Sequence, residues 1–503
     1  MQVIADLQLH SRFSRAVSPQ MTISTIATWA RRKGIDVVAT GDWTHPIWFR
    51  EIERDLEEMG NGLLKLRAQV ANENFDPSSV SSASHTTITT QRENEAGQNF
   101  VVSPHERRSP LFLLATEVSC IYSQGGKVRR VHTLIWVPTL DSARKISREM
   151  TKQGCNLLSD GRPIVGLTSI QIAELVFTIE PKALIIPAHA WTPWFAVYGS
   201  LGGFDSIQEA FGPYADQIYA VETGLSSNPS MNWRIRELDT RAIVSFSDAH
   251  SGPKLGREAT VFDLDELSYA SIYQAIKAPS LNHRSGIMNQ GDTTHRTPDT
   301  RHSMQQSRIA YTIEFYPEEG KYHYTGHRAC HVRQTPEETR AKGTACPVCG
   351  KPLTVGVMHR VEALAARTEE SVGCHVVRPQ DPSIQAVMYG STAFPTRPPF
   401  VMLVPLQEII AEAIGSPVTS PKVQMPYMRL TSEVGNEFDV LLRKELDTIA
   451  RVAGTRVADG VSRMRKGNLH IDPGYDGVFG VVKIWGKGEK GIGDSNKEQL
   501  SLL

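Results

Sequence analysis

The sequence has few cysteines for its length, no net charge and no long apolar run. Six cysteines among 503 residues are too few for a disulfide scaffold, so we expect reduced thiols. No run approaches the roughly 18 apolar residues that a membrane helix requires. The opening residues MQVIADLQLH lack the pattern of a signal peptide. We therefore expect a cytoplasmic protein with no membrane partner.

The charge balance and the motif content exclude further classes. The 54 basic and 54 acidic residues cancel, so a polyanionic partner must be held by a local patch or by metal. The phosphate loop G-x-x-x-x-G-K-[ST] does not occur, which argues against a helicase or another motor.

Short β-branched apolar runs alternate with amphipathic helix patterns as far as about Ala278. Because strands that alternate with helices form parallel sheets, this pattern predicts an α/β fold, either a closed barrel or an open sheet. The runs that we expect to be strands are Val3–Ala5, Ile35–Ala39, Pro110–Glu117, Val131–Val137, Ala183–Pro187 and Ala242–Phe246, and the first clear helix is Ile23–Lys33.

Two polar stretches divide the chain. Residues 68–110 are rich in Ser and Thr and have no apolar period, which predicts a disordered insertion within a first domain of residues 1–288. Residues 289–308 are a predicted linker. A small module with aromatic residues and cysteines follows at 309–359. Residues 360–503 are predicted to be mainly helical, with helices at 360–368, 405–414, 437–453 and 457–466 and a Gly-rich, strand-like end.

Candidate metal ligands close the predicted strands of the first domain. Because the carboxyl ends of parallel strands gather at one face, we expect these side chains to converge. Four His, two Asp and one Glu suit Zn²⁺ or Mn²⁺, and paired ions can activate a water and stabilise phosphoryl displacement. One such His alone is more often structural, but seven such residues together favour a metal site. They are His10, Asp42, Glu117, His132, His189, Asp248 and His250.

These motifs resemble the PHP (polymerase and histidinol phosphatase) superfamily of metal-dependent phosphoesterases. The stretches DLQLHSRFSRAVS, TGDWTHP, GRPIVGL, PAHAWTPWFAVYG, SFSDAHS, CPVCGKPL and PGYDGVFG more narrowly resemble the endonuclease Q family, whose members nick DNA beside deaminated bases. The resemblance implies a distorted β/α barrel that is followed by a small zinc-binding module and a C-terminal helical domain.

The resemblance also implies two or three catalytic divalent ions, Zn²⁺, Mn²⁺ or Mg²⁺, held by the seven residues above. Glu117 would bridge ions, and Asp248 and His250 would lie near the attacking water, so these three are the expected catalytic residues. Gln8 stands where the superfamily has its first metal-binding His. Because an amide is a poor zinc ligand, we expect the ion at Gln8 to be weak, absent or not zinc, and Asp42 favours harder ions.

The implied activity is hydrolysis of double-stranded DNA on the 5′ side of a deaminated base (uracil, hypoxanthine or xanthine) or of an abasic site. The replication sliding clamp is a further partner that the resemblance implies. Two alternatives stay open: a small-molecule phosphoesterase of the histidinol-phosphatase type, and a DNA-binding protein with a degenerate metal site.

A second metal site is predicted in the small module. His327 and Cys330 form an HxxC knuckle, and Cys346 and Cys349 form a CxxC knuckle 15 residues later. Two knuckles at this spacing can close a tetrahedral site, and thiolates favour Zn²⁺. Because all four positions would be filled, we expect one structural zinc ion rather than a catalytic one.

Candidate DNA contacts are basic pairs and aromatic residues. Arginines and lysines could contact phosphates, and tryptophans near His189 could stack on an unpaired base. The basic residues could equally be solvated surface charges, and the aromatic residues could equally pack in the core. The candidates are Arg129, Arg130, Arg463, Arg465 and Lys466, the segment 321–328, and Trp191 and Trp194.

Overall fold

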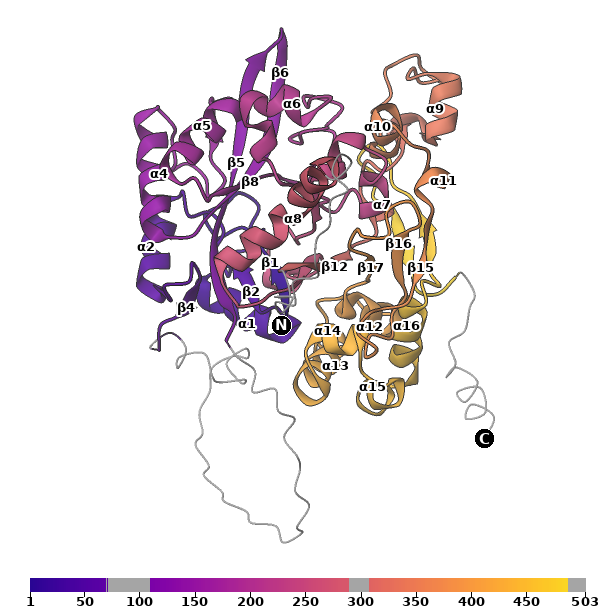
Figure 1. Cartoon of the computed structure of the whole chain (residues 1–503). Coiled ribbons are helices and arrows are strands. Elements are labelled where there is room, and N and C mark those ends of the chain that lie inside the picture. Colours follow the sequence, from indigo (N-terminus) through magenta and orange to yellow (C-terminus); the bar gives the residue numbers. More distant parts are fainter. Residues whose placement is uncertain (69, 71–108, 289–306, 487–503) are drawn as a thin grey trace, which may run out of the picture.

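The computed structural model describes residues 1–68, 70, 109–288 and 307–486 (Figure 1). The insertion predicted at 68–110 and the linker predicted at 289–308 lie almost entirely outside these residues.

Eight strands of the first domain form a distorted barrel. β1 pairs in parallel with β2, and β2 with β5, whereas β5–β6 and β6–β8 are antiparallel. β9 and β10 form a separate parallel pair in the gap between β8 and β11. Ala190 N, just after β8, donates to Glu222 O of β9, and Ser245 N, just after β10, donates to Thr260 Oγ1 of β11. The predicted α/β barrel is confirmed. Its strands are β1 (Gln2–Asp6), β2 (Val37–Ala39), β5 (Leu111–Gln124), β6 (Lys127–Val137), β8 (Leu184–Pro187), β9 (Ala220–Glu222), β10 (Ala242–Val244) and β11 (Ala259–Asp263).

Helices cover the outside of the barrel, and Figure 1 shows α2, α4 and α5 along one side of it. The first helix has the predicted bounds: Thr22 caps its amino end and Gly34 ends it with a φ of 90°. Ile23, Ile26 and Ala30 are buried at helical spacing. The helices are α1 (Ile23–Lys33), α2 (Pro46–Asp55), α4 (Leu140–Lys152), α5 (Ser169–Ile179), α6 (Ile207–Phe211), α7 (Pro229–Asn232) and α8 (Tyr269–Met288).

The barrel sheet continues into the C-terminal half of the chain. β11 pairs with β1 on one side and with β12 on the other, and β17, β16 and β15 follow in order. The module predicted at 309–359 therefore shares its first strand with the barrel sheet. The added strands are β12 (Arg308–Glu314), β17 (Phe400–Met402), β16 (Met388–Ser391) and β15 (Cys374–Val377). At the other edge, β4 (Leu64–Leu66) and β7 (Ile164–Val165) pair with β5, and β3 (Leu56–Glu58) pairs with β4.

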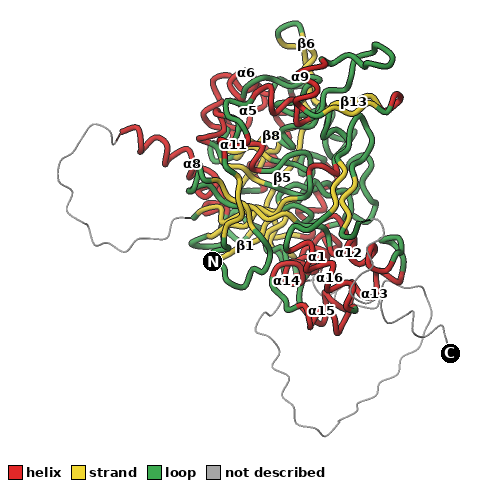
Figure 2. The backbone as a smooth tube through the Cα atoms, turned by 90° about the vertical axis from the view of Figure 1, so that its right-hand side faces the viewer, coloured by secondary structure: helices red, strands yellow, loops and turns green. Residues whose placement is uncertain are grey.

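The C-terminal helices pack below the strands, on the side of α1 (Figure 2). A buried ion pair of 2.7 Å between Lys33 Nζ and Glu437 Oε2 joins α1 to α14. The single helix predicted at 437–453 is two helices, because the side chain of Arg465 binds the carbonyls of Val440, Leu441 and Lys444 where α14 ends. The helices are α12 (Leu406–Ile414), α13 (Pro421–Arg429), α14 (Glu437–Leu442), α15 (Leu446–Ala453) and α16 (Thr455–Arg465).

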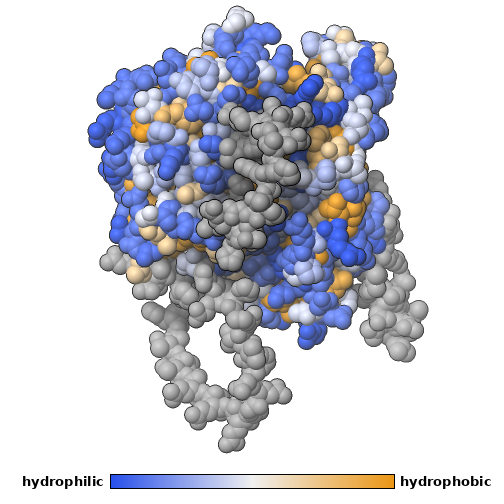
Figure 3. Space-filling model, viewed as in Figure 1, coloured by the Kyte–Doolittle hydropathy of each residue, from blue (hydrophilic) through white to orange (hydrophobic). Residues whose placement is uncertain are grey.

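The cysteine-bearing segment packs against the barrel at the upper right of Figure 1. It contains β13 (Thr325–His327), β14 (Val332–Gln334), α9 (Pro336–Lys342), α10 (Val357–Leu364) and α11 (Glu369–Val372), and the hairpin of β18 (His470–Asp472) and β19 (Val481–Lys483) lies against it. On the face shown in Figure 3, hydrophobic residues form small patches among hydrophilic ones. Within the described residues, no helix combines the length and apolar character needed to cross a bilayer.

Candidate metal centre

Two adjoining groups of metal-ligating side chains lie at one end of the barrel. His10, Asp248 and His250 form the first, and Glu117, His132 and His189 form the second. Within each group the ligand atoms lie within 4.8 Å of one another. The groups meet at His10, whose Nε2 is 3.1 Å from Glu117 Oε2 and 3.2 Å from Asp248 Oδ1. The fold thus brings together six of the seven predicted ligands.

The ligands reach the centre in two ways. His10, His189 and Asp248 follow the ends of β1, β8 and β10, as predicted. Glu117 and His132 instead lie within β5 and β6, because these two strands continue past the centre as a long hairpin. The expectation that every ligand closes its strand was therefore wrong for these two residues.

Three residues at the centre adopt left-handed backbone conformations. The φ angles of Asp42, His189 and Asp248 are 45°, 31° and 46°. Non-glycine residues in this region cost about 1–3 kcal/mol each, although Asp and His are tolerated there better than most residues. The turns that follow β2, β8 and β10 therefore store strain where they present side chains to the centre.

Buried oxygens at the centre fit a divalent cation. Glu117 Oε1, Asp248 Oδ1 and Gln8 Oε1 are buried and lack a well-aligned hydrogen bond, and imidazole nitrogens of His132 and His10 lie against the two carboxylate oxygens. Buried polar atoms are normally paired, and unpaired ones mark a missing water or ion. Carboxylate oxygens beside imidazole nitrogens are a donor set that Zn²⁺ and Mn²⁺ accept. The residues present can therefore hold divalent metal.

Hydrogen bonds orient two imidazoles toward the centre. His10 Nδ1 lies 3.0 Å from Asp42 Oδ1, and His250 Nδ1 lies 2.8 Å from the carbonyl oxygen of Asp248. A proton on each Nδ1 satisfies these acceptors, so Nε2 is the atom that a metal ion would bind in place of a proton. A carboxylate or carbonyl behind a histidine is the usual way in which proteins orient a metal-binding imidazole.

The electrostatics of the centre favour positive charge. Burial alone would lower the pKa of His10, but Asp42, Asp248 and Glu117 around it raise that pKa well above its ordinary value. Burial lowers the pKa of His132 to about 4 despite the neighbouring Glu117, so its imidazole is neutral near pH 7. A neutral imidazole is the form that binds metal.

Asp42 supports a ligand and is not itself in either group. Its Oδ1 accepts from His10, and its Oδ2 accepts from Ser11 N (2.6 Å), Ser11 Oγ (2.7 Å) and Ser14 Oγ (2.9 Å). Both oxygens of Asp42 are therefore occupied by hydrogen bonds. Asp42 was predicted to be a metal ligand, but in the structure it supports the ligand His10 instead. Gln8 does lie at the centre, where its Nε2 donates to Glu117 Oε2 at 2.8 Å.

Arg162 is a residue of the centre that the sequence analysis missed. Its Nη1 lies 3.4 Å from His10 Nε2 and 3.6 Å from Glu117 Oε1. Gly161 allows this approach, since a Cβ there would lie 2.4 Å from Asp42 Oδ2. The stretch GRPIVGL was noted as part of the family resemblance, but its arginine was given no role.

The predicted cysteine knuckles also converge. The ligand atoms of His327, Cys330, Cys346 and Cys349 lie within 4.8 Å of one another, and Cys349 Sγ is 3.4 Å from His327 Nδ1. Burial opposes ionisation of Cys346, but the N–H groups of Cys349 and Val348 lower its pKa to about 6. This set of four ligands could hold a divalent metal.

Three predicted DNA contacts are buried and engaged elsewhere, because of neighbours distant in sequence. Arg129 bonds Gly203 O and Glu209 and stacks on Phe204, Trp191 donates to Asn232 at 2.8 Å, and Arg465 caps α14. These predictions are corrected: the three side chains are structural.

The other predicted DNA contacts reach the surface. Arg130 and Trp194 are half-buried, and Lys466 is exposed. Arg463 is half-buried and pairs with Asp459 at 3.2 Å. The ring of Trp194 lies 5.1 Å from that of Tyr322, edge to face. These side chains are thus at least partly exposed, and Arg463 is already paired.

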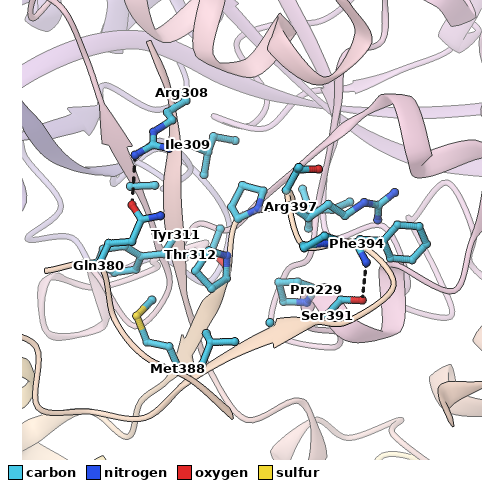
Figure 4. A pocket seen from close by; sticks show the side chains of 18 of the residues that line it. Pro229, Arg308, Ile309, Tyr311, Thr312, Gln380, Met388, Ser391, Phe394 and Arg397 are labelled. Carbon is cyan, nitrogen blue, oxygen red and sulfur yellow. Dashed lines mark hydrogen bonds between the residues drawn. The ribbon is translucent and has the colours of Figure 1, made fainter. Parts of the chain in front are cut away.

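A separate cavity of about 900 Å³ lies away from the metal centre. Figure 4 shows side chains from β12, β16 and the loop around Phe394 that line it, with Arg308 bonded to Gln380 (3.2 Å) and Phe394 N to Ser391 Oγ (3.1 Å). None of the ligand residues described above lines this cavity. We therefore assign the chemistry to the metal centre.

Comparison with known proteins extends over nearly the whole chain. Residues 405–468 match the model of the MJ0043 C-terminal domain. The chain is 30% identical over 303 residues to the uncharacterized protein MJ0043 of Methanocaldococcus jannaschii, a match of 59% of this chain and 31% of that relative. The chain thus spans about a third of the length of that relative.

Two solved structures cover both chains almost completely. The lesion-specific endonuclease PfuEndoQ from Pyrococcus furiosus is 28% identical, with a TM-score of 0.70 over 99% of each chain. Endonuclease Q in complex with a 27-mer duplex that has an abasic lesion at the active site gives the same identity and TM-score over 98% of this chain and 100% of that chain. In sequence and fold the chain is therefore endonuclease Q-like, which confirms the resemblance predicted from its motifs.

Proposed function

We propose that this protein is a metal-dependent DNA repair endonuclease that hydrolyses the phosphodiester on the 5′ side of a deaminated base or an abasic site. The observation that carries the proposal is the pair of adjoining ligand groups around His10 and Glu117. The likeness to endonuclease Q supports the substrate, because one such structure holds an abasic duplex at its active site.

The ligand residues are graded from buried to exposed. The side chains of His10 and Glu117 are 0% and 1% exposed, whereas those of Asp248 and His250 are 23% and 32% exposed. Arg162 is also 23% exposed. The scissile phosphate would therefore approach the centre at the edge that Asp248, His250 and Arg162 form.

Each residue at this edge has a role that follows from its chemistry. Two or three divalent ions, Zn²⁺, Mn²⁺ or Mg²⁺, would activate water and offset the charge on the phosphate oxygens. Asp248, whose Oδ1 also lies 3.2 Å from His10 Nε2, can accept a hydrogen bond from the attacking water at this edge, and the carbonyl oxygen of Asp248 orients His250. Arg162 can donate two hydrogen bonds to non-bridging oxygens of the phosphate. Glu117 belongs to the second group, contacts His10 of the first at 3.1 Å, and would bridge ions.

A structural zinc ion at His327, Cys330, Cys346 and Cys349 is part of the proposal. Three sulfur donors and one imidazole fill a tetrahedral site and leave no open position for substrate. The ion would hold the two knuckles together beside the barrel, because few apolar contacts do so at the exposed Cys349 and its neighbours.

DNA would be held by the surface residues identified above. Arg130, Arg463 and Lys466 would contact phosphates, and Trp194 would stack near an extruded base. A deaminated base pairs poorly and costs less to unstack, which explains a preference for damage. The sliding clamp stays a prediction from the resemblance alone.

One observation favours a rival function. Gln8 replaces an expected ligand, which is what a DNA-binding protein with a degenerate centre would show. The six convergent ligands and the unpaired oxygens support an active centre instead. A small-molecule phosphoesterase would have no use for the extended sheet and C-terminal helices beside the centre.

A nicking assay tests the proposal. End-labelled duplexes with uracil, hypoxanthine, xanthine, an abasic site or no lesion are incubated with Mn²⁺, Mg²⁺ or Zn²⁺, with and without chelator. We expect metal-dependent cleavage 5′ of the lesion, lost in Asp248→Ala and retained in the matched control Asp141→Ala, whose carboxylate is on the surface of α4. Turnover of a small phosphomonoester without nicking would move the protein to the phosphatase class.

A further inference from the structure

The hairpin of β18 and β19 presents an aromatic ring to solvent. Its connecting residues 473–480 read PGYDGVFG, and Phe479 in this turn is 65% exposed. Val478 and Val481 beside it are 39% and 43% exposed. A phenylalanine this exposed adds little to the stability of the fold, because burial is what makes large apolar side chains stabilising.

The turn is held in place although its side chains are exposed. It packs on residues 318–324, which we term the strap. Gly474 N donates to Glu318 O at 2.8 Å, Gly477 N to Lys321 O at 2.9 Å and Gly480 N to Glu319 O at 3.1 Å. A Cβ on Gly480 would lie 2.0 Å from Glu318 O, so this contact requires glycine. The ring of Phe479 is therefore presented by a fixed backbone.

One cation lies over the ring, and two others lie on neighbouring residues. Lys321 Nζ lies 4.4 Å from the centroid of Phe479 and is exposed. Arg328 is exposed beside Gly477, and Lys483 is exposed on β19. Asp472 is bound by Arg333, and Asp476 by Arg328 N and Thr354. The strap also contains the half-buried Glu318 and Glu319. The exposed Lys321, which lies over the ring, can therefore contact a phosphate beside it.

The strap connects this turn to the metal centre. Tyr322 in the strap lies edge to face with Trp194 at 5.1 Å. Thr192 Oγ1 donates to Trp194 O at 2.8 Å and lies 3.3 Å from Nδ1 of the ligand His189. Contacts therefore link the strap that carries the Phe479 turn to the loop of the ligand His189.

We infer that Phe479 is a wedge that enters the base stack of duplex DNA at the position of a missing or extruded nucleotide. The inference rests on the proposed function. Apolar side chains inserted between bases unstack and kink a duplex, and an aromatic ring can replace the stacking that a lost base provided. Lys321 and its neighbours would hold the flanking phosphates while the ring fills the gap.

Binding of a duplex with a tetrahydrofuran abasic analogue tests this inference. A 2-aminopurine beside the analogue reports unstacking through its fluorescence, and a phosphorothioate at the scissile bond slows cleavage. The proteins are the full wild-type chain, Phe479→Ala, Phe479→Leu and Met425→Ala, whose methionine is 66% exposed on α13 and serves as the matched control. Thermal melting checks that each variant is folded.

We expect Phe479→Ala to bind the abasic duplex roughly 5- to 150-fold more weakly and to lose most of the fluorescence change. Its affinity for undamaged duplex should stay within about twofold of the wild type, since the ring has no gap to enter there. Phe479→Leu should keep most of both signals, because leucine also serves as an apolar wedge. Met425→Ala should match the wild type.

Three results would overturn the inference. Equal affinity and fluorescence for Phe479→Ala and the wild type would reassign the ring to another partner, such as a protein. An equal loss on damaged and undamaged duplex would make it a general DNA contact. If the wild type nicks abasic DNA and one of these two results is found, the wedge inference is refuted and the proposed function stands. If the wild type neither binds nor nicks, the wedge and the proposed function fail together.

Discussion

Replacement of Asp42 by asparagine should change which ring nitrogen of His10 carries the proton. Asp42 Oδ2 accepts from the backbone N–H of Ser11 at 2.6 Å, and Oδ1 accepts from His10 Nδ1 at 3.0 Å. A backbone N–H can only donate, so the amide oxygen of the new side chain must take the Oδ2 position. The amide nitrogen then faces His10 Nδ1, which has to accept.

The proton of His10 consequently moves to Nε2, the atom that faces Glu117 and Asp248. A protonated Nε2 has no lone pair for a metal ion. Loss of a carboxylate behind a metal-binding histidine typically costs 10- to 100-fold in metal affinity or activity, which is about 1.4–2.7 kcal/mol. In a Ser-His-Asp protease the same exchange, with the wrong tautomer, lowers kcat by about 10⁴, so we take that value as the upper limit.

Equilibrium dialysis followed by elemental analysis measures metal per chain, and the cysteine site supplies an internal reference because it is unaffected. Nicking rates as a function of Mn²⁺ concentration give the functional effect. We expect partial recovery of Asp42→Asn at high metal concentration. Ser14→Ala is the control, because it removes one donor to Asp42 Oδ2 without reversing the tautomer.

Two outcomes would refute this reasoning. Wild-type metal affinity in Asp42→Asn would show that the tautomer of His10 does not matter. Complete metal loss, equal to that of Asp248→Ala and not recovered at high concentration, would show that Asp42 is itself a ligand.

Three further predictions address other parts of the molecule. Arg162→Ala should lower kcat/KM for the damaged duplex roughly 10²- to 10³-fold, as expected for a lost phosphate contact, with unchanged metal content and partial recovery in Arg162→Lys; loss of metal instead would make Arg162 a support for the ligands. Cys349→Ser should lose the structural zinc and lower the melting temperature by roughly 5–10 °C, measured with zinc content by calorimetry and elemental analysis; full zinc occupancy would contradict the assignment. Burial raises the pKa of Glu314 from 4.5 to about 7, so its stabilising protonated form is lost as pH rises toward 7. The Glu314→Gln side chain cannot ionise. Its free energy of unfolding minus that of the wild type should therefore rise by roughly 3 kcal/mol between pH 5 and pH 8 in denaturant titrations. A constant difference across this range would show that the carboxyl is not held neutral.

The sequence pattern predicted the strands and helices of an α/β fold because their signals are local, and the family resemblance supplied the closed barrel. The helix at Ile23–Lys33 has a threonine cap, buried residues at helical spacing and a terminal glycine, and its bounds were confirmed. The continuation of the sheet through β12, β17, β16 and β15 was not predicted. Those strands pair with partners far away in sequence, and periodicity carries no information about which strand lies next to which.

The metal centre was likewise predicted where its signals are local and missed where they depend on distant residues. His10, Glu117 and Asp248 were predicted because ligand types recur near the predicted strands. The supporting role of Asp42 depends on Ser11 and Ser14, which neighbour His10 in the chain but gave no signal. A lone arginine in a loop, such as Arg162, has no pattern at all, and the burial of Arg129, Trp191 and Arg465 depends on distant partners.

The double pairing of β11 has a mechanical consequence. Since the backbone of this strand is hydrogen-bonded to β1 on one edge and to β12 on the other, β12 cannot separate from the barrel without breaking a ladder of bonds. In the proposed function, a sheet that resists this separation would leave much of the bending to the duplex. A duplex yields most easily where pairing is already lost, so the stiffness of the sheet would act as a filter for weak points in DNA, whatever chemical change produced them.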